Sequence, residues 1–521
     1  MTETPLPLIP WPRQLERRDG SCSLSSSKGY VLDADDDSRA RATAALDLLR
    51  RGTGLSATTT TEPHALRLRL GPLEDDAADE ADHVLDIAAD AIMIQANEAS
   101  GFLAAVQTLR QLLPAELEPA WDDESSDPSP GGALELPCLR IEDGPRFGWR
   151  GQHLDVVRHF FGADVVADFL RLAGSYKLNR LHWHLTDDQG WRLPLPGRPL
   201  LTEKGGRRRE TIVEKNFNPF VGDGVPHEGS YTLDEIRDLV ELAGWLGVEL
   251  VPEIDLPGHA TALLVAHPEL ACGEAPTEVE CSWGEFEGVI CPSETNVVAL
   301  TELLAATAEL FPGAFLHLGG DEVPRSRWER CSEVASLQEG EGLDGLEQVL
   351  SHFIDRLARP LIDRGRTVLA WDEVLEGGPR EDLVLCAWRD ASRVAAAARA
   401  GHRVISCYQQ ALYFDHYQGP PESEPLAIGG FSNAEKVHGV EPVPEELSSD
   451  EQARVIGVQG QLWTEYIATV EHLQVMALPR LLALAEVAWS SKDRPGWSHF
   501  EQRLGTHLDR LRRRGFAVHG G

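Results

Sequence analysis

From about residue 146 to the C-terminus, short apolar runs alternate with longer amphipathic segments. Eight of the runs have the length and composition of buried strands: 151–156, 180–185, 248–254, 314–318, 367–370, 383–387, 403–406 and 456–461. Thr232-Leu233-Asp234-Glu235 is a capping box, which predicts a helix over 236–246. Because strands that alternate with helices form parallel sheets, eight such units predict a (β/α)8 barrel over residues 146–521.

The first 145 residues have a less regular pattern. Strand-like runs at 66–70 and 91–94 and one amphipathic helix at 101–113 are separated by acidic loops of small residues at 73–76 and 121–132. This mixture predicts a small N-terminal α/β domain, with a mixed sheet and helices, over residues 1–145. Nothing in it has the pattern of a catalytic site.

Polar and aromatic residues follow every predicted strand of the barrel, at the end where (β/α)8 barrels carry their chemistry. They are Asp155, Arg158, Asp187, Asp188, Asp255, His259, Asp321, Glu322, Trp371, Asp372, Glu373, Trp388, Tyr413, Asp415, Trp463 and Glu465. Aromatic faces stack on the apolar faces of a pyranose, while carboxylates and arginine bond its hydroxyls. The set therefore predicts a sugar-binding pocket, although each tryptophan alone could equally serve packing.

Two adjacent carboxylates, Asp321 and Glu322, follow the fourth strand in the segment 317–323 (HLGGDEV). One interpretation is that Asp321 caps a following helix. The other is proton transfer to a leaving group. A retaining glycosidase separates its acid and nucleophile by about 5 Å across the scissile bond. Neighbouring Cα atoms lie only about 3.8 Å apart, so the nucleophile comes from another strand or from the substrate's own 2-acetamido oxygen.

Several blocks make the chain similar to glycoside hydrolase family 20, the β-N-acetylhexosaminidases. The matching blocks are 154–161 (LDVVRHFF), 178–191 (LNRLHWHLTDDQGW), 251–259 (VPEIDLPGH), 317–323, 371–373 and 462–465, with 101–114 resembling the family's N-terminal domain. The resemblance implies an exo-acting, retaining enzyme without a cofactor. It would remove terminal β-linked GlcNAc or GalNAc through an oxazolinium intermediate, as a substrate-assisted exception to the two-carboxylate scheme.

The resemblance also implies roles at the catalytic centre. Glu322 would be the general acid/base, Asp321 would orient the acetamido group, and Tyr413 would bond the acetamido oxygen. Because the acid must hold a proton, apolar walls and nearby negative charge are expected to raise the pKa of Glu322.

The remaining roles concern the substrate. The family pattern implies that three tryptophans enclose the acetamido group and the sugar ring. It also implies that Arg158 and two acids bond the ring hydroxyls, and that two further residues support the general acid. The tryptophans are Trp371, Trp388 and Trp463, the two acids Asp415 and Glu465, and the supporting pair Asp187 and His259. No tryptophan occurs between Tyr417 and Gln459, where some members close the pocket, and Phe431 is the candidate substitute.

Two rival functions stay open. His182 and His184 alternate with apolar residues and share one strand face, so they could bind metal as in barrel metallohydrolases, but interior hydrogen bonding is the favoured interpretation. The second rival is a sugar-binding protein that has lost catalysis. Retention of Asp321, Glu322 and Tyr413 argues against it.

Composition narrows the partners. A formal net charge of −36 disfavours nucleic acid and anionic membranes, and no apolar run approaches the roughly 20 residues of a membrane span. The first residues lack the basic and apolar regions of a secretory signal, which predicts a cytoplasmic protein. The eight cysteines show no C-x-x-C and no metal pattern; Cys272, Cys281 and Cys291 could hold one disulfide, which a cytosolic chain would keep reduced.

Overall fold

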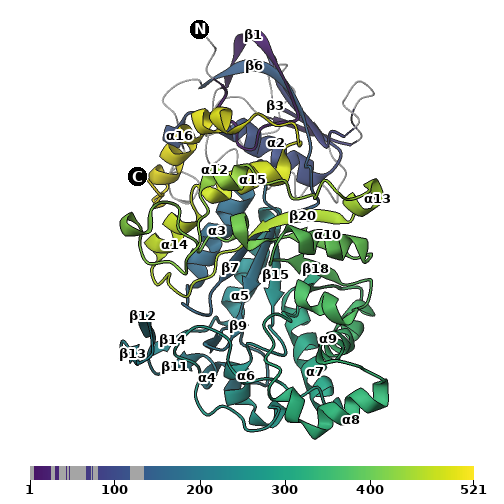
Figure 1. Cartoon of the computed structure of the whole chain (residues 1–521). Coiled ribbons are helices and arrows are strands. Elements are labelled where there is room, and N and C mark those ends of the chain that lie inside the picture. Colours follow the sequence, from purple (N-terminus) through teal and green to yellow (C-terminus); the bar gives the residue numbers. More distant parts are fainter. Residues whose placement is uncertain are drawn as a thin grey trace.

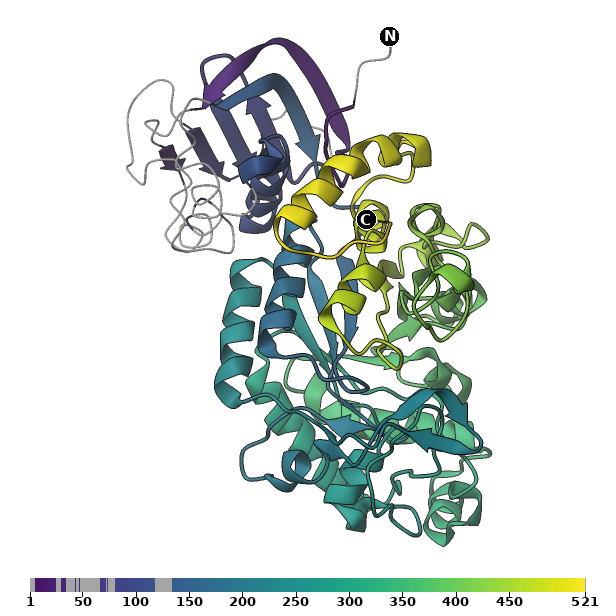
Figure 2. The same cartoon turned by 90° about the vertical axis from the view of Figure 1, so that its left-hand side faces the viewer.

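The structure is a computed structural model that describes residues 5–24, 30–33, 43, 46, 66–71, 73, 80–117 and 134–520. It contains a six-stranded sheet near the N-terminus and a closed barrel of eight strands (Figures 1 and 2). The predicted loops at 73–76, apart from Leu73, and at 121–132 lie outside the described residues.

The N-terminal sheet is mixed and has the strand order β1-β6-β4-β5-β3-β2. Its strands are β1 (Gln14–Leu24), β2 (Tyr30–Asp33), β3 (Leu66–Leu70), β4 (His83–Ile87), β5 (Ile92–Ala96) and β6 (Leu134–Asp143). Helix α2 (Ala99–Gln111) packs Phe102 and Leu109 against it in a core separate from that of the barrel. The strands predicted at 66–70 and 91–94 and the helix predicted at 101–113 are therefore confirmed.

All eight strands predicted for the barrel are present. They are β7 (Trp149–Asp155), β8 (Arg180–His184), β15 (Glu249–Glu253), β16 (Phe315–His317), β17 (Thr367–Trp371), β18 (Val384–Ala387), β19 (Arg403–Ser406) and β20 (Val455–Gly460). Each pairs in parallel with its neighbour, and β8 pairs with β15 to close the ring. The predicted (β/α)8 fold is confirmed.

Helices and short turns surround the barrel. The helices are α3 (Ala163–Ser175), α4 (Leu200–Glu203), α5 (Leu233–Trp245), α6 (Thr261–Ala266), α7 (Glu294–Leu310), α8 (Ser332–Glu341), α9 (Leu346–Ile362), α10 (Ala391–Arg399), α11 (Gln409–Leu412), α12 (Ala434–His438), α13 (Ser449–Gln452), α14 (Val470–Ala477), α15 (Arg480–Trp489) and α16 (Trp497–Arg513). The 3-10 turns are η2 (Pro268–Leu270), η3 (Trp328–Arg330), η4 (Asp372–Gly377) and η5 (Pro421–Ser423). The predicted capping box opens α5, because the Thr232 hydroxyl accepts from the Glu235 N–H.

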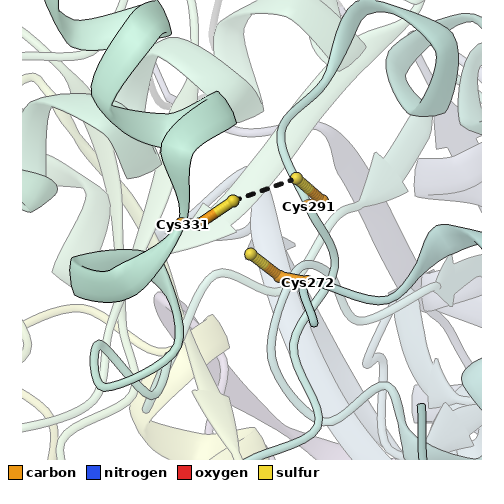
Figure 3. A group of neighbouring side chains, drawn as sticks. All are labelled: Cys272, Cys291 and Cys331. Atoms are coloured by element: carbon orange, nitrogen blue, oxygen red, sulfur yellow. Dashed lines mark hydrogen bonds between the residues drawn. The ribbon is translucent and has the colours of Figure 1, made fainter. Parts of the chain in front are cut away.

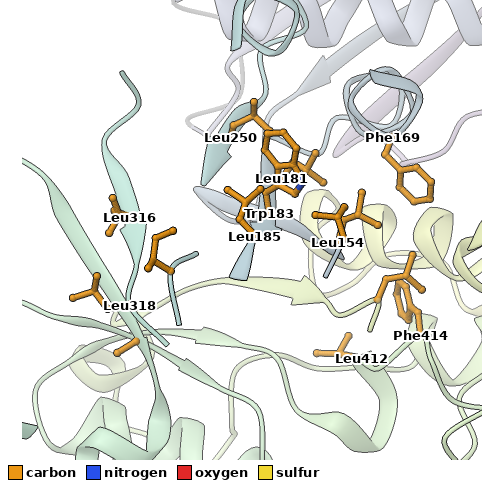
Figure 4. Packing of buried hydrophobic residues seen from close by; sticks show 14 of the residues in the cluster. Leu154, Phe169, Leu181, Trp183, Leu185, Leu250, Leu316, Leu318, Leu412 and Phe414 are labelled. Carbon is orange, nitrogen blue, oxygen red and sulfur yellow. The ribbon is translucent and has the colours of Figure 1, made fainter. Parts of the chain in front are cut away.

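Strand β8 shows how the alternation of side chains sorts core from site. Leu181 and Trp183 are completely buried among the apolar residues that pack between strands and helices, together with Phe169 of α3 (Figure 4). His182 and His184 alternate with them and face the barrel interior, where His182 lies against His317 of β16. The two faces of one strand therefore supply the core and the floor of the site.

Short antiparallel strands between β8 and α5 form an extension at the end of the barrel away from the N-terminal sheet (Figure 1). They are β9 (Thr186–Asp187), β10 (Gly190–Trp191), β11 (Arg207–Arg208), β12 (Ile212–Phe217), β13 (Phe220–Gly222) and β14 (His227–Glu228). At the other end, buried Asp143 at the end of β6 accepts from Lys177 Nζ at 3.0 Å and from Trp489 Nε1 at 2.9 Å, which joins the sheet to the barrel. None of the described helices is long and apolar enough to cross a membrane.

Candidate active site

A pocket of about 590 Å³ opens at the carboxyl ends of the barrel strands. Ten of the eleven residues proposed from the sequence line it: Arg158, His259, Asp321, Glu322, Trp371, Trp388, Tyr413, Asp415, Trp463 and Glu465. The eleventh, Asp187, is buried behind the wall and contacts Arg158 and His259. Residues from strand ends far apart in sequence thus meet at one site.

The paired acids reach the pocket because two glycines turn the chain after β16. Gly319 and Gly320 have φ of 71° and 100°, and a Cβ on Gly319 would lie 1.7 Å from Asp255 Oδ1, so only glycine fits there. Glu322 itself has φ of 47°, a strained value for a residue with a side chain. No helix begins at Asp321, since η3 starts at Trp328, and the helix-cap interpretation is therefore wrong.

His259 links Glu322 to buried carboxylates. Its Nδ1 lies 3.2 Å from Asp187 Oδ1 and 3.2 Å from Asp188 Oδ2, and its Nε2 lies 3.6 Å from Glu322 Oε2. Burial alone lowers the pKa of His259, but the Asp187 and Asp188 carboxylates outweigh it and raise the pKa well above 6.5. The imidazole is therefore positively charged where it faces Glu322.

That charge contradicts one expectation from the sequence. The contact with His259 lowers the pKa of Glu322 below its usual 4.5 instead of raising it. The Glu322 side chain is 38% exposed, so apolar walls do not enclose it without substrate. The neighbouring Asp321 behaves oppositely: burial, together with the charges of Glu253 and Glu322, raises its pKa to about 6. Asp321 Oδ1 is buried without a hydrogen-bond partner among the described residues.

Carboxylates behind the wall fix the aromatic residues of the pocket. Trp371 Nε1 donates to Glu253 Oε1 at 2.8 Å, and Trp388 Nε1 donates to Glu373 Oε1 at 2.9 Å. The rings of Trp371 and Trp463 lie 6.1 Å apart between centroids, and those of Trp388 and Tyr413 lie 6.2 Å apart and stacked. The aromatic residues therefore form one box, shared by four strand ends.

Tyr413 occupies a different position from the one expected. Strand β19 ends at Ser406, helix α11 intervenes, and Tyr413 then makes an isolated parallel bridge with Gln461. This bridge extends the barrel locally and returns the ring to the pocket. Burial and the nearby Asp415 raise the pKa of Tyr413 well above 10, so its hydroxyl remains a hydrogen-bond donor.

A polar part of the lining centres on Arg158, whose guanidinium lies over the Trp463 ring. Its Nη2 lies 2.8 Å from Asp187 Oδ2 and its Nη1 3.2 Å from Asp155 Oδ2. Asp415 Oδ1 and Glu465 Oε2 are buried without a hydrogen-bond partner among the residues that the structure describes. Buried polar atoms of this kind are costly unless a ligand bonds them, and sugar hydroxyls would do so.

His182 and His184 show the interior hydrogen bonding predicted for them. His184 lies 2.6 Å from Glu253 Oε2 and 2.8 Å from Asp187 Oδ2, while His182 lies 3.2 Å from Glu253 Oε2 and accepts from Gln459. Both are buried beneath the pocket and neither lines it. Glu253, the centre of this network, was not predicted, although an acid within a mostly apolar strand was the available signal.

The outer rim contains residues that were not anticipated. Trp283 and Glu285 of the loop between η2 and α7 line the pocket, as do Phe217 and the segment 428–430. Phe431, suggested as a replacement for a missing tryptophan, is 47% exposed and does not line the pocket. Phe217, Trp283 and Tyr466 thus add aromatic side chains to the lining.

A parallel barrel whose strand ends gather carboxylates, one arginine and an aromatic box around a sugar-sized pocket defines the protein as a glycoside hydrolase. Residues 147–492 match the model of the glycosyl hydrolase family 20 catalytic domain, and residues 6–144 match that of the family's domain 2. The chain belongs to glycoside hydrolase family 20, the β-N-acetylhexosaminidases.

Known relatives cover nearly the whole chain. A β-hexosaminidase of Porphyromonas gingivalis is 35% identical over 98% of the chain, which spans 64% of that relative's length. A β-N-acetylhexosaminidase of Cellulomonas fimi is 31% identical and covers 98% of this chain and 95% of its own. Among solved structures, the exo-β-N-acetylglucosaminidase of Vibrio harveyi in complex with N-acetylglucosamine has a TM-score of 0.83 at 29% identity, covering 98% of this chain and 78% of its own.

Proposed function

We propose that the protein is an exo-acting, retaining β-N-acetylhexosaminidase that uses the substrate's acetamido oxygen as nucleophile. The observation that carries the proposal is the adjacency of Asp321 and Glu322 beside the aromatic box. Neighbouring residues cannot flank a scissile bond as acid and nucleophile. The crystallised Vibrio relative, which binds N-acetylglucosamine, supports the same sugar here.

The reaction follows from the placement of three groups. Glu322 gives its proton to the glycosidic oxygen as the bond to the anomeric carbon breaks, and the acetamido oxygen forms the new bond to that carbon. Asp321 accepts a hydrogen bond from the amide N–H and balances the positive charge of the oxazolinium. Tyr413 donates to the acetamido oxygen. Water then attacks the anomeric carbon, Glu322 takes its proton, and the sugar leaves with its configuration retained.

Arg158, Asp415 and Glu465 fit the hydroxyls of the terminal ring. Their unpaired oxygens and the guanidinium form a polar part of the lining, with the guanidinium 4.9 Å from the centre of the Trp463 ring. Groups that bond the hydroxyls of the terminal ring favour removal of single terminal residues. We infer GlcNAc and GalNAc as substrates, since both carry the acetamido group on which the mechanism depends.

Hydrolysis of p-nitrophenyl N-acetyl-β-D-glucosaminide tests the proposal against the rival of a binding protein without catalysis. The expected result is release of p-nitrophenol, with the plain β-glucoside cleaved far more slowly because it lacks the internal nucleophile. Comparable rates on the two substrates would exclude acetamido participation. Binding of N-acetylglucosamine without any hydrolysis would instead establish the binding protein.

The pH dependence of kcat/KM is expected to be bell-shaped, with its basic limb near pH 6. Above the pKa of about 6 of Asp321, both carboxylates are ionised and no proton is available for the leaving oxygen. Below the pKa of Glu322, which the contact with His259 lowers, both carboxylates are protonated. Asp321 then cannot accept a hydrogen bond from the amide N–H. The active form carries one proton on the two carboxylates together, so each limb of the pH profile reports a pKa of the pair and not of a single residue. Initial rates across pH measure this, and a rate that keeps rising above pH 6 would contradict it.

Tyr413→Phe is expected to lower kcat about 10²-fold, with a small change in KM, because one donor to the developing oxazolinium is lost. Tyr417→Phe is the matched control, since Tyr417 packs against the core and does not line the pocket. Steady-state kinetics on the 2-acetamido substrate measure both variants. Equal kinetics for Tyr413→Phe and the control would remove Tyr413 from the proposed mechanism.

A further inference from the structure

Three cysteines meet in the fold, two of them from the segment between η2 and α7 and one from the start of α8. Cys272 follows η2, Cys291 precedes α7, and Cys331 lies at the start of α8. Their sulfur atoms point toward one another (Figure 3) and lie within 4.8 Å of each other. Cys281, which the sequence grouped with Cys272 and Cys291, is absent from this cluster and donates instead to the Val279 carbonyl.

The spacing of the thiols is that of metal ligands. Two thiolates bound to zinc at about 2.3 Å in tetrahedral geometry have sulfur atoms about 3.8 Å apart, and Cys291 Sγ lies 3.8 Å from Cys331 Sγ. A disulfide requires about 2.05 Å. The Glu333 carboxylate accepts a hydrogen bond from Cys291 Sγ at 2.9 Å and lies outside the group of three sulfur atoms.

We propose that Cys272, Cys291 and Cys331 bind one structural Zn²⁺ ion, and that Glu333 takes the fourth position once its hydrogen bond to Cys291 is broken. Soft thiolates select zinc over magnesium or calcium, and four protein donors leave no open position for catalysis. Cys272 and Cys291 are almost completely buried, whereas Glu333 is exposed and gives the ion a route of entry. Binding displaces the thiol protons, so metal affinity rises with pH.

The ion would join two segments that carry the active site. Cys272 and Cys291 bracket the loop that brings Trp283 and Glu285 to the rim of the pocket. Cys331 ends the segment that follows Asp321 and Glu322. Protein hydrogen bonds already link these segments, with Trp328 Nε1 donating to the Ile290 carbonyl at 2.9 Å. Bonds to the metal would fix the position of the rim relative to Asp321 and Glu322. The role of the ion is therefore positioning and not chemistry.

The test is the metal content of the reduced full-length protein after incubation with Zn²⁺ and removal of the free ion. The wild type is expected to retain one zinc per chain and Cys331→Ser close to none. Cys281→Ser, which removes a buried thiol of the same loop, should retain one. Co²⁺ in place of Zn²⁺ should give the visible bands of a tetrahedral site and a thiolate charge-transfer band in the wild type and the control.

A second measurement does not depend on a variant that folds. Titration of wild-type thiols with a mercurial, in the presence of a chromogenic zinc indicator, should release the ion stoichiometrically. Wild-type protein with no more zinc than Cys331→Ser, or zinc that is not released by the mercurial, would overturn the proposal. Because neither readout involves hydrolysis, a failure here is distinguishable from a failure of the proposed enzymatic function.

Discussion

Glu322→Gln is expected to lower kcat/KM for a chitooligosaccharide about 10²–10⁴-fold, the usual contribution of a positioned general acid. Glutamine keeps the shape of the side chain but has no proton to give to the leaving oxygen. The loss should be much smaller for a 2,4-dinitrophenyl glycoside, whose leaving group departs without protonation. Steady-state kinetics with the two substrates measure the difference.

Glu329→Gln is the matched control, because Glu329 lies on the same segment and is exposed to solvent. Its kinetics should equal those of the wild type on both substrates. If Glu322→Gln lowered kcat/KM by the same factor for the 2,4-dinitrophenyl glycoside and the chitooligosaccharide, Glu322 would not be acting as the general acid. The position of Glu322, at φ of 47° and facing His259, would then need another explanation.

The barrel was predictable because its strands are buried on both faces and read as near-continuous apolar runs. Strand β1 shows why the N-terminal sheet was predicted less completely. Glu16, Arg17, Arg18 and Asp19 are consecutive charged residues, and most of the strand is exposed. Its pairing with β6 depends on a partner more than a hundred residues away, which no local pattern reveals.

The site was predictable as far as it depends on position along a strand. Arg158, His259, Asp321 and Trp371 all follow strands, and the closed barrel brings such positions together. Glu253 was missed, and Glu373 was predicted only as a strand-end acid, because their roles depend on the indoles of Trp371 and Trp388, which donate to them. Such partners are set by side-chain geometry, not by spacing.

The pKa of Glu322 was predicted wrongly for the same reason. The sequence indicates that a histidine and several acids are near, but not which of them faces Glu322. In the structure the charged His259 imidazole faces Glu322. Burial instead raises the pKa of Asp321. The acid pair therefore shares its proton unequally before substrate binds. Entry of the sugar, which covers the exposed Glu322 side chain, is the event that can move the proton to it.

Asp321→Asn is expected to lower kcat on 2-acetamido substrates about 10²–10³-fold, because the charge that balances the oxazolinium is lost. The ratio of kcat/KM for p-nitrophenyl N-acetyl-β-D-glucosaminide to that for the plain glucoside should fall by a similar factor, since Asp321 acts only on the acetamido group. The variant should also lose the basic limb near pH 6. Activity would then follow the lowered pKa of Glu322 alone and decline from more acidic pH.

Glu285→Gln separates this effect from a general loss of charge in the pocket. Glu285 lines the same pocket on the rim, and its replacement should change both substrates together and leave their ratio unaltered. An Asp321→Asn enzyme that kept both the ratio and the limb near pH 6 would show that Asp321 neither steers the amide nor titrates in that range. In that case another group would have to hold the amide, and the adjacency of the two acids would no longer explain the mechanism.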